Sequence, residues 1–196
     1  MPNGTLDWYR ENLEEFIGRT ENVDMSALYD RFLTLVPSGG YVMDLGCGAG
    51  NAALYFTRKG YRVLAVDGCR ELCDHTFRRV GCPVRTLRFE ELDYEDAFDG
   101  VWVCASLLHV RKTDLPRVFF LVRRALKKSG AFYASFKYGE TERDKNGRVF
   151  SDMTEEALRA LAEDVGGFRE IRIWTTGDAR PDHADELWVN VLCRAE

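Results

Sequence analysis

The stretch from Val42 to Asn51, which reads VMDLGCGAGN, constrains the fold of this chain more than any other segment. Glycines stand at positions 46, 48 and 50, directly after an apolar run that contains one acid, Asp44. Alternating glycines allow a tight turn, and they let a ligand reach the main chain without a Cβ in the way. The spacing therefore predicts a ligand-binding turn between a strand and a helix, which we favour over a turn of purely structural role.

Patterns typical of strands and helices alternate after this turn. Apolar runs predict seven strands, over residues 41–45, 61–67, 83–89, 98–108, 131–138, 168–176 and 186–193. Amphipathic spacing predicts helices between most of them, over residues 51–60, 70–81, 113–128 and 154–163. This order predicts an α/β, Rossmann-like fold whose seven-stranded sheet is mostly parallel, with an antiparallel C-terminal hairpin and helices on both faces.

Two segments lie outside this alternation. Apolar residues spaced by three and four predict one helix over residues 6–17 and another over 28–36. The stretch 139–153 is polar and is predicted to be a loop, and Thr154 is predicted to cap the helix that follows it. At 196 residues, we expect a single domain.

The composition is that of an ordinary globular protein, with 45% hydrophobic and 30% charged residues. We see neither a membrane span nor a secretory signal, which predicts a cytoplasmic location. The six cysteines lack the paired spacing of metal ligands, which predicts reduced thiols and no metal. A net charge of −5 gives no strong nucleic-acid signal. The basic residues between Arg123 and Lys128 are predicted to lie at a helix end, where cations suit the helix dipole.

Three classes of ligand compete for the glycine turn. A phosphate-binding loop needs Gly-Lys-Ser/Thr, whereas Asn51 and Ala52 follow the last glycine. A dinucleotide fingerprint is disfavoured by Asp44 and by Asn51. Asp67 ends the next predicted strand, where a carboxylate can accept hydrogen bonds from both hydroxyls of a ribose. Its alternative role is to cap the next helix, but with the glycine turn upstream we favour ribose binding.

The motifs DLGCGAG, VLAVDGC, FDGVWVCASLLHV and LKKSGAFYASF together resemble the class I S-adenosylmethionine-dependent methyltransferases. The resemblance covers residues 41–138 and is nearest to small bacterial members of the ubiquinone-biosynthesis and tellurite-resistance types. It implies one methyltransferase domain over 1–196, with a helical lid (1–38) and an S-adenosylmethionine-binding core (39–196).

The resemblance also implies methyl transfer to a small-molecule acceptor, with S-adenosylhomocysteine as product and no metal. Methylation of tRNA or of a protein side chain, and a non-catalytic S-adenosylmethionine sensor, are the alternatives. We expect a monomer or a homodimer.

The same resemblance implies roles for individual residues in the donor site. The methionine end is assigned to Asp44, Gly46, Gly48 and the backbone carbonyl of Cys104, the ribose to Asp67, and the adenine to Gly68, Cys69, Phe89 and Glu90. Relatives usually carry an acid after the third strand, where this chain has Arg88, so Glu90, Glu91 or main-chain groups would replace it. Tyr9 and Arg19 are assigned to a lid over the donor.

On the acceptor side, methyl transfer depends mainly on alignment and on exclusion of water. A general base helps only where the acceptor arrives protonated. His109, Lys137 and Tyr138 are the candidates for that role, although for His109 we favour a structural histidine. The turn 178–185, the stretch 139–153 and the N-terminal helices are expected to surround the acceptor.

Overall fold

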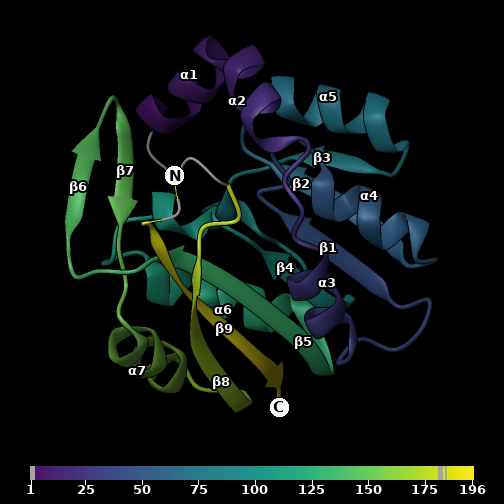
Figure 1. Ribbon diagram of the computed structural model, residues 1–196. Coiled ribbons are helices and arrows are strands. Elements are labelled where there is room, and N and C mark those ends of the chain that lie inside the picture. Colours follow the sequence, from purple (N-terminus) through teal and green to yellow (C-terminus); the bar gives the residue numbers. More distant parts are fainter. Residues whose placement is uncertain (1–2, 181–182, 184) are drawn as a thin grey trace.

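A twisted sheet runs through the centre of the molecule, with helices against both of its faces (Figure 1). The computed structural model describes residues 3–180, 183 and 185–196. The seven-stranded sheet has the order β3-β2-β1-β4-β5-β9-β8. Its strands are β1 (Tyr41–Leu45), β2 (Arg62–Asp67), β3 (Val84–Thr86), β4 (Phe98–Val103), β5 (Leu126–Lys137), β8 (Phe168–Gly177) and β9 (Leu187–Ala195). Strands β1 to β5 pair in parallel, whereas β9 runs antiparallel between β5 and β8. The predicted fold class is confirmed.

The helices cover the sheet in two layers, each with its own apolar cluster. They are α1 (Asn3–Glu11), α2 (Leu13–Thr20), α3 (Ser26–Leu33), α4 (Asn51–Arg58), α5 (Arg70–Val80), α6 (Leu115–Ala125) and α7 (Glu155–Val165), with short 3-10 turns η1 (Phe89–Glu91) and η2 (Leu107–His109). Helices α3 and α4 pack on one face, where Trp102 of β4 stacks on Tyr133 of β5 at 3.9 Å. Helices α6 and α7 pack on the other face around Phe119 and Phe132. Neighbouring strand residues point to opposite faces, so every central strand contributes to both clusters.

The N-terminal region differs from its prediction. The helix expected over 6–17 is divided into α1 and α2 at Asn12, whose φ of −114° and ψ of 28° lie outside the helical region. Its side-chain amide donates to the carbonyl of Trp8 at 2.8 Å, and this local bond accompanies the bend. Apolar spacing continues through the bend, so the sequence pattern does not reveal it.

The stretch 139–153 is not the predicted loop, because it contains a hairpin of β6 (Glu142–Lys145) and β7 (Arg148–Ser151). The two strands are joined by Asn146 and Gly147, whose φ values of +52° and +76° suit a two-residue hairpin turn. The hairpin stands beside α1 at one end of the sheet (Figure 1). The cap at Thr154 is confirmed, since its hydroxyl accepts from the amide of Ala157 at 3.1 Å.

Other predicted boundaries were also wrong. The third strand, predicted over 83–89, ends at Thr86, and Phe89 begins η1. The fourth strand ends at Val103 rather than at residue 108, and Ala105 then adopts a positive φ of +50° that ends the extended backbone. Lys127 and Lys128 lie in β5 rather than at the end of α6, and Lys127 forms an ion pair with Asp99 of β4. Within the described residues, no helix is long and apolar enough to cross a membrane.

Candidate functional site

The glycine turn joins β1 to α4 in a conformation that needs glycine. Gly46, Gly48 and Gly50 have φ values of +79°, +51° and +83°, all in the left-handed region. The amides of Gly46 and Cys47 both donate to the carbonyl of Val66, at 2.7 and 3.0 Å, so the turn is tied to the neighbouring strand β2. The turn therefore lies at the carboxyl ends of β1 and β2, where open α/β sheets bind their ligands.

Asp67, the last residue of β2, reaches into this turn. Its Oδ2 accepts from the amide of Gly48 at 3.0 Å, and its Oδ1 accepts from the amide of Cys69 at 2.9 Å. Cys69 is the residue that precedes α5, so the carboxylate also supports a helix start. Burial raises the pKa of Asp67, and the two amides oppose that shift. Each oxygen keeps a second lone pair, so the carboxylate can still accept hydrogen bonds from a ligand.

Asp44 is a second buried carboxylate beside the same turn. Its Oδ2 accepts from the amide of Ala53 in α4 at 3.0 Å. Burial raises the pKa of Asp44 to about 7, and the negative charge of Asp67 adds to this rise. Within the described part of the chain, neither carboxylate forms an ion pair. Two buried acids without a cation make this a favourable place for a positively charged ligand.

The residues predicted to surround an adenine lie at the ends of β2 and β3. Gly68 and Cys69 follow Asp67 directly, and Phe89 and Glu90 lie in η1 after β3. The Phe89 ring belongs to the apolar core beneath the turn, 3.6 Å from where a Cβ on Gly46 would lie. Cys104 follows β4 and is partly exposed, with its thiol 3.5 Å from the hydroxyl of Ser135. The fold thus brings these positions to one end of the sheet.

The N-terminal helices cover this end of the sheet. The ring of Phe16 lies 3.3 Å from where a Cβ on Gly48 would stand, and the side chain of Leu6 lies 2.9 Å from the same position on Gly68. The side chain of Asn51 donates to the carbonyl of Thr20 at 2.7 Å. Sequence reasoning missed Leu6 and Phe16 as site residues, because apolar spacing marks a helix face without indicating which surface that face will cover.

The half-buried Tyr9 and the buried His109 form a pair between α1 and η2. His109 Nδ1 lies 2.6 Å from the carbonyl oxygen of Val149, which can only accept, so Nδ1 carries the proton. His109 Nε2 therefore accepts from the Tyr9 hydroxyl at 2.8 Å. Burial lowers the pKa of His109 to about 4 and raises that of Tyr9 to about 12. Both groups are neutral near pH 7, and the histidine presents a lone pair toward α1.

This pair gives a testable dependence of stability on pH. The pKa of His109 in the native state lies below its unfolded value of 6.5. The contribution of the neutral histidine to the free energy of unfolding is therefore complete above pH 6.5 and is lost as the pH falls toward 4. Between pH 7 and pH 4.5, we expect the wild type to lose about 2–3 kcal/mol of unfolding free energy relative to His109→Gln. Urea unfolding of both proteins at the two pH values measures this difference. A constant difference would contradict a neutral buried histidine.

The other predicted residues lie farther along the same end. Lys137 Nζ lies 2.5 Å from Glu186 Oε2, and the charge of Lys137 contributes to the lowered pKa of His109. Tyr138 is 46% exposed and lies at the rim. Arg19 contacts Glu15 and His183, which ties α2 to the turn between β8 and β9. The structure therefore places Lys137 and His109 within electrostatic range of each other, and it leaves the Tyr138 side chain exposed.

Comparison with known proteins finds methyltransferases that are similar to this chain. The solved structure of 1,6-didemethyltoxoflavin-N1-methyltransferase from Burkholderia thailandensis, with bound 1,6-didemethyltoxoflavin and S-adenosylhomocysteine, has the same fold, with a TM-score of 0.75 and 22% identity over 100% of this chain and 92% of that one. A family profile described as "Methyltransferase domain" matches residues 42–130, from β1 into β5. Residues 42–130 thus match a methyltransferase domain, and the chain has the fold of a solved methyltransferase.

Two curated proteins are similar to this chain in sequence over part of their length. The putative methyltransferase YqeM from Bacillus subtilis (strain 168) is 28% identical over 132 residues, which is 62% of this chain and 52% of the relative. The S-adenosyl-L-methionine-dependent Diels-Alderase iccD from Talaromyces variabilis is 28% identical over 111 residues, which is 50% of this chain and 36% of the relative. The chain thus spans 52% and 36% of these two proteins.

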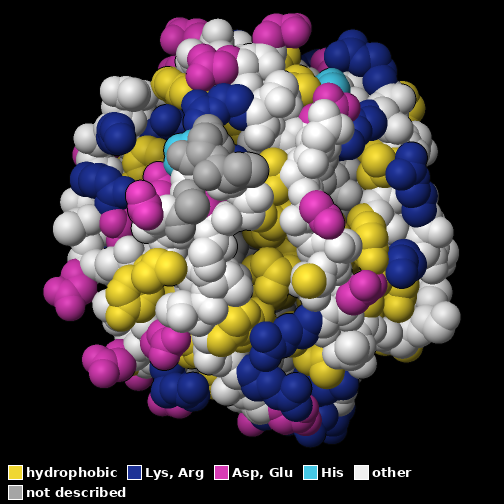
Figure 2. Space-filling view, viewed as in Figure 1, with side chains coloured by type: hydrophobic (Ala, Val, Ile, Leu, Met, Phe, Trp, Pro, Cys, Tyr) yellow, Lys and Arg dark blue, Asp and Glu magenta, His cyan; other side chains and the backbone are white. Residues whose placement is uncertain are grey.

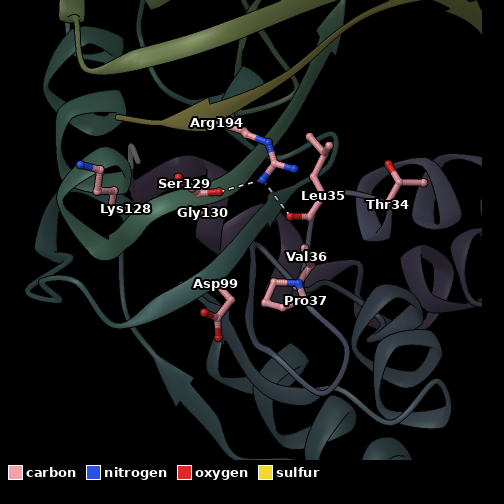
Figure 3. A pocket seen from close by; sticks show the side chains of 9 residues that line it. All are labelled: Thr34, Leu35, Val36, Pro37, Asp99, Lys128, Ser129, Gly130 and Arg194. Atoms are coloured by element: carbon pink, nitrogen blue, oxygen red, sulfur yellow. Dashed lines mark hydrogen bonds between the residues drawn. The ribbon is translucent and has the colours of Figure 1, made fainter.

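A separate pocket of about 380 Å³ lies at the opposite end of the sheet (Figure 3). Its lining comes from the segment between α3 and β1, from the first residues of β4 and β5 and from the end of β9: Thr34, Leu35, Val36, Pro37, Asp99, Lys128, Ser129, Gly130 and Arg194. Arg194 donates to the carbonyls of Leu35 and Ser129 at 3.1 and 2.9 Å, so its guanidinium is engaged by the main chain. In the described part of the chain, no group of three or more His, Cys, Asp or Glu side chains is arranged to hold a metal ion.

Proposed function

We propose that the chain transfers a methyl group from S-adenosylmethionine to a small-molecule acceptor. The observation that carries the proposal is the pair of buried carboxylates, Asp44 and Asp67, which lie beside a glycine turn and form no ion pair with the described residues. The donor carries a sulfonium and an ammonium, and either charge would stabilise these carboxylates in their ionised form. Residues 1–38 act as a lid over a core of residues 39–196.

The residues present fit the donor. The main-chain groups of Gly46 and Gly48 and the carboxylate of Asp44 would receive its methionine part, and Asp67 would accept from its ribose hydroxyls. Cys104 would offer its backbone carbonyl to the ammonium. The adenine would lie near Gly68, Cys69, Phe89 and Glu90, which the fold brings to the ends of β2 and β3.

The chain's own groups would then exclude water and hold the acceptor. When bound, S-adenosylmethionine supplies a methyl group activated by the sulfonium. Tyr9 and Phe16 close over the strand ends, so that reacting groups meet in a desolvated space. His109 Nε2 already accepts from the Tyr9 hydroxyl, so it would receive a proton from the acceptor only where the acceptor takes the place of that hydroxyl, while the Nδ1 proton stays donated to the carbonyl of Val149. Lys137 and Glu186 would contribute a polar wall, and Tyr138 would contact the acceptor at the rim.

The surface beside this site suits a small acceptor with an apolar body. Figure 2 shows hydrophobic side chains gathered in a hollow near the centre of the view, over β4 and β5. Partly buried apolar residues of the cluster on this face include Leu28, Cys104 and Trp174. The Burkholderia protein, whose structure contains 1,6-didemethyltoxoflavin, is consistent with a small-molecule acceptor. Six free thiols agree with a reducing, cytoplasmic location.

Calorimetric titration tests the donor site first. We expect S-adenosylmethionine and S-adenosylhomocysteine to bind at one site per chain, and nicotinamide dinucleotide not to bind. Binding of the dinucleotide alone would contradict the proposal.

A second experiment tests the reaction. The protein is incubated with methyl-labelled donor and, separately, with a small-molecule extract, total tRNA or a protein extract. We expect label to appear in the small-molecule fraction together with S-adenosylhomocysteine. Label in tRNA or in protein would instead identify that macromolecule as the acceptor and would contradict a small-molecule acceptor. Donor binding without formation of S-adenosylhomocysteine in any fraction would favour a sensor, or a catalyst that keeps its donor, as the name of the Talaromyces relative suggests for that protein.

A further inference from the structure

Gly68 is a glycine for a reason other than backbone conformation. It follows Asp67 at the end of β2, and it is absent from the glycines with positive φ. A Cβ added to it would lie 2.9, 3.6 and 3.9 Å from three atoms of Leu6, and these are the three nearest atoms. Any L-residue can adopt the backbone at this position, so what the missing side chain permits is the close approach of α1. Leu6 occupies the space that a side chain at position 68 would fill.

The helix that carries Leu6 is fixed on its other side. The amide of Val149 in β7 donates to the Thr5 hydroxyl at 3.3 Å, and the guanidinium of Arg148 stacks on the Trp8 ring at 3.5 Å. Tyr9 lies three residues after Leu6 and donates to His109. Residues three apart share one face of a helix. One face of α1 thus contacts the end of β2 through Leu6 and η2 through Tyr9.

We propose that Leu6 forms an apolar wall of the adenosine pocket, in the space that a side chain at position 68 would otherwise fill. Helix α1 thereby closes against the donor itself. The inference rests on the proposed function, since it concerns the donor assigned to Asp67. An aliphatic side chain beside the nucleoside removes apolar surface from water when the donor binds. Tyr9 and His109 hold the same helix at the acceptor side, so donor binding and closure of the acceptor side occur together.

Replacing Leu6 by alanine tests the wall. We expect affinity for S-adenosylhomocysteine to fall about tenfold in Leu6→Ala, because the methyl groups that cover the nucleoside are lost. The same loss is expected for 5′-methylthioadenosine, which has the adenosine but not the amino acid. Leu33→Ala is the matched control, since Leu33 is a partly buried leucine of α3 that packs on the sheet cluster instead. Circular dichroism and thermal unfolding establish that each variant is folded.

The converse substitution tests whether the two positions share one space. Gly68→Leu places a second side chain where Leu6 lies, and we expect it also to weaken binding by displacing α1. The double variant Leu6→Ala/Gly68→Leu restores a single side chain in that space, so we expect it to bind more tightly than either single variant.

Hydrogen exchange gives an independent readout of closure. We expect S-adenosylhomocysteine to slow exchange of the α1 amides in the wild type and to have a weaker effect in Leu6→Ala. Unchanged or tighter binding by Leu6→Ala, a loss limited to S-adenosylhomocysteine and not seen with 5′-methylthioadenosine, or merely additive effects in the double variant would overturn the inference. A wild type that binds neither S-adenosylmethionine nor S-adenosylhomocysteine would instead contradict the proposed function.

Discussion

Replacing Asp67 by asparagine is expected to weaken binding of S-adenosylmethionine by about 10- to 100-fold, since each charge-assisted hydrogen bond to a ligand contributes about 1.5–3 kcal/mol. Two effects act together. The ribose hydroxyls lose a charged acceptor, and the turn loses one of its supports, because an amide has a single oxygen where Asp67 uses two to accept from Gly48 and Cys69. Calorimetric titration measures the affinity, and urea unfolding measures the loss of stability.

The matched control is Asp99→Asn at the opposite end of the sheet. Asp99 accepts from the backbone amide of Tyr41 at 2.8 Å and pairs with Lys127, so it too is a carboxylate that supports the main chain. We expect Asp99→Asn to lower stability without changing donor affinity. If both variants bind the donor as the wild type does, the ribose role of Asp67 is wrong.

The core of the fold was predictable because its signals are local. The apolar run at β1, the glycine turn and the strand that ends at Asp67 follow one another in sequence, and parallel strands end at the same edge of a sheet. The proximity of Asp44, Gly48 and Asp67 therefore follows from strand order alone. The hydrogen bond from the Gly48 amide to the Asp67 carboxylate is a contact that this strand order makes possible.

The elements that we expect to surround the acceptor were less predictable, for two physical reasons. The β6–β7 hairpin is polar over much of its length, so alternation of apolar and polar residues does not mark it, although Asn146-Gly147 is a hairpin-turn signal. The contacts of Leu6 with Gly68 and of Tyr9 with His109 join residues far apart in sequence. Local periodicity shows that α1 has an apolar face, but the partner of that face is decided by packing.

Replacing Gly46 by alanine is expected to have the largest effect on the fold. From the sequence, this glycine was predicted to leave room for a ligand, but the structure shows that the space beside it is occupied by Ser106. An added Cβ would lie 2.4 Å from the Cβ of Ser106 and 2.5 Å from its Oγ. The serine hydroxyl donates to the carbonyl of Leu45 at 3.1 Å, so its side chain is held in place. Positive φ adds about 1–2 kcal/mol of strain for alanine, and forced overpacking adds about 1–3 kcal/mol.

Gly60→Ala separates strain from overpacking. Gly60 has a similar φ of +86°, but a Cβ there would meet nothing within 4 Å, so we expect a loss of only about 1–2 kcal/mol. Urea unfolding should rank Gly46→Ala well below Gly60→Ala in stability, and donor binding should be lost only in the former. Adding Ser106→Gly to Gly46→Ala removes the colliding Cβ, so the double variant should recover part of the stability despite losing the bond to Leu45. Equal losses at positions 46 and 60 would mean that Gly46 is needed for its backbone conformation alone, and that β1 and the segment after β4 are not in tight contact there.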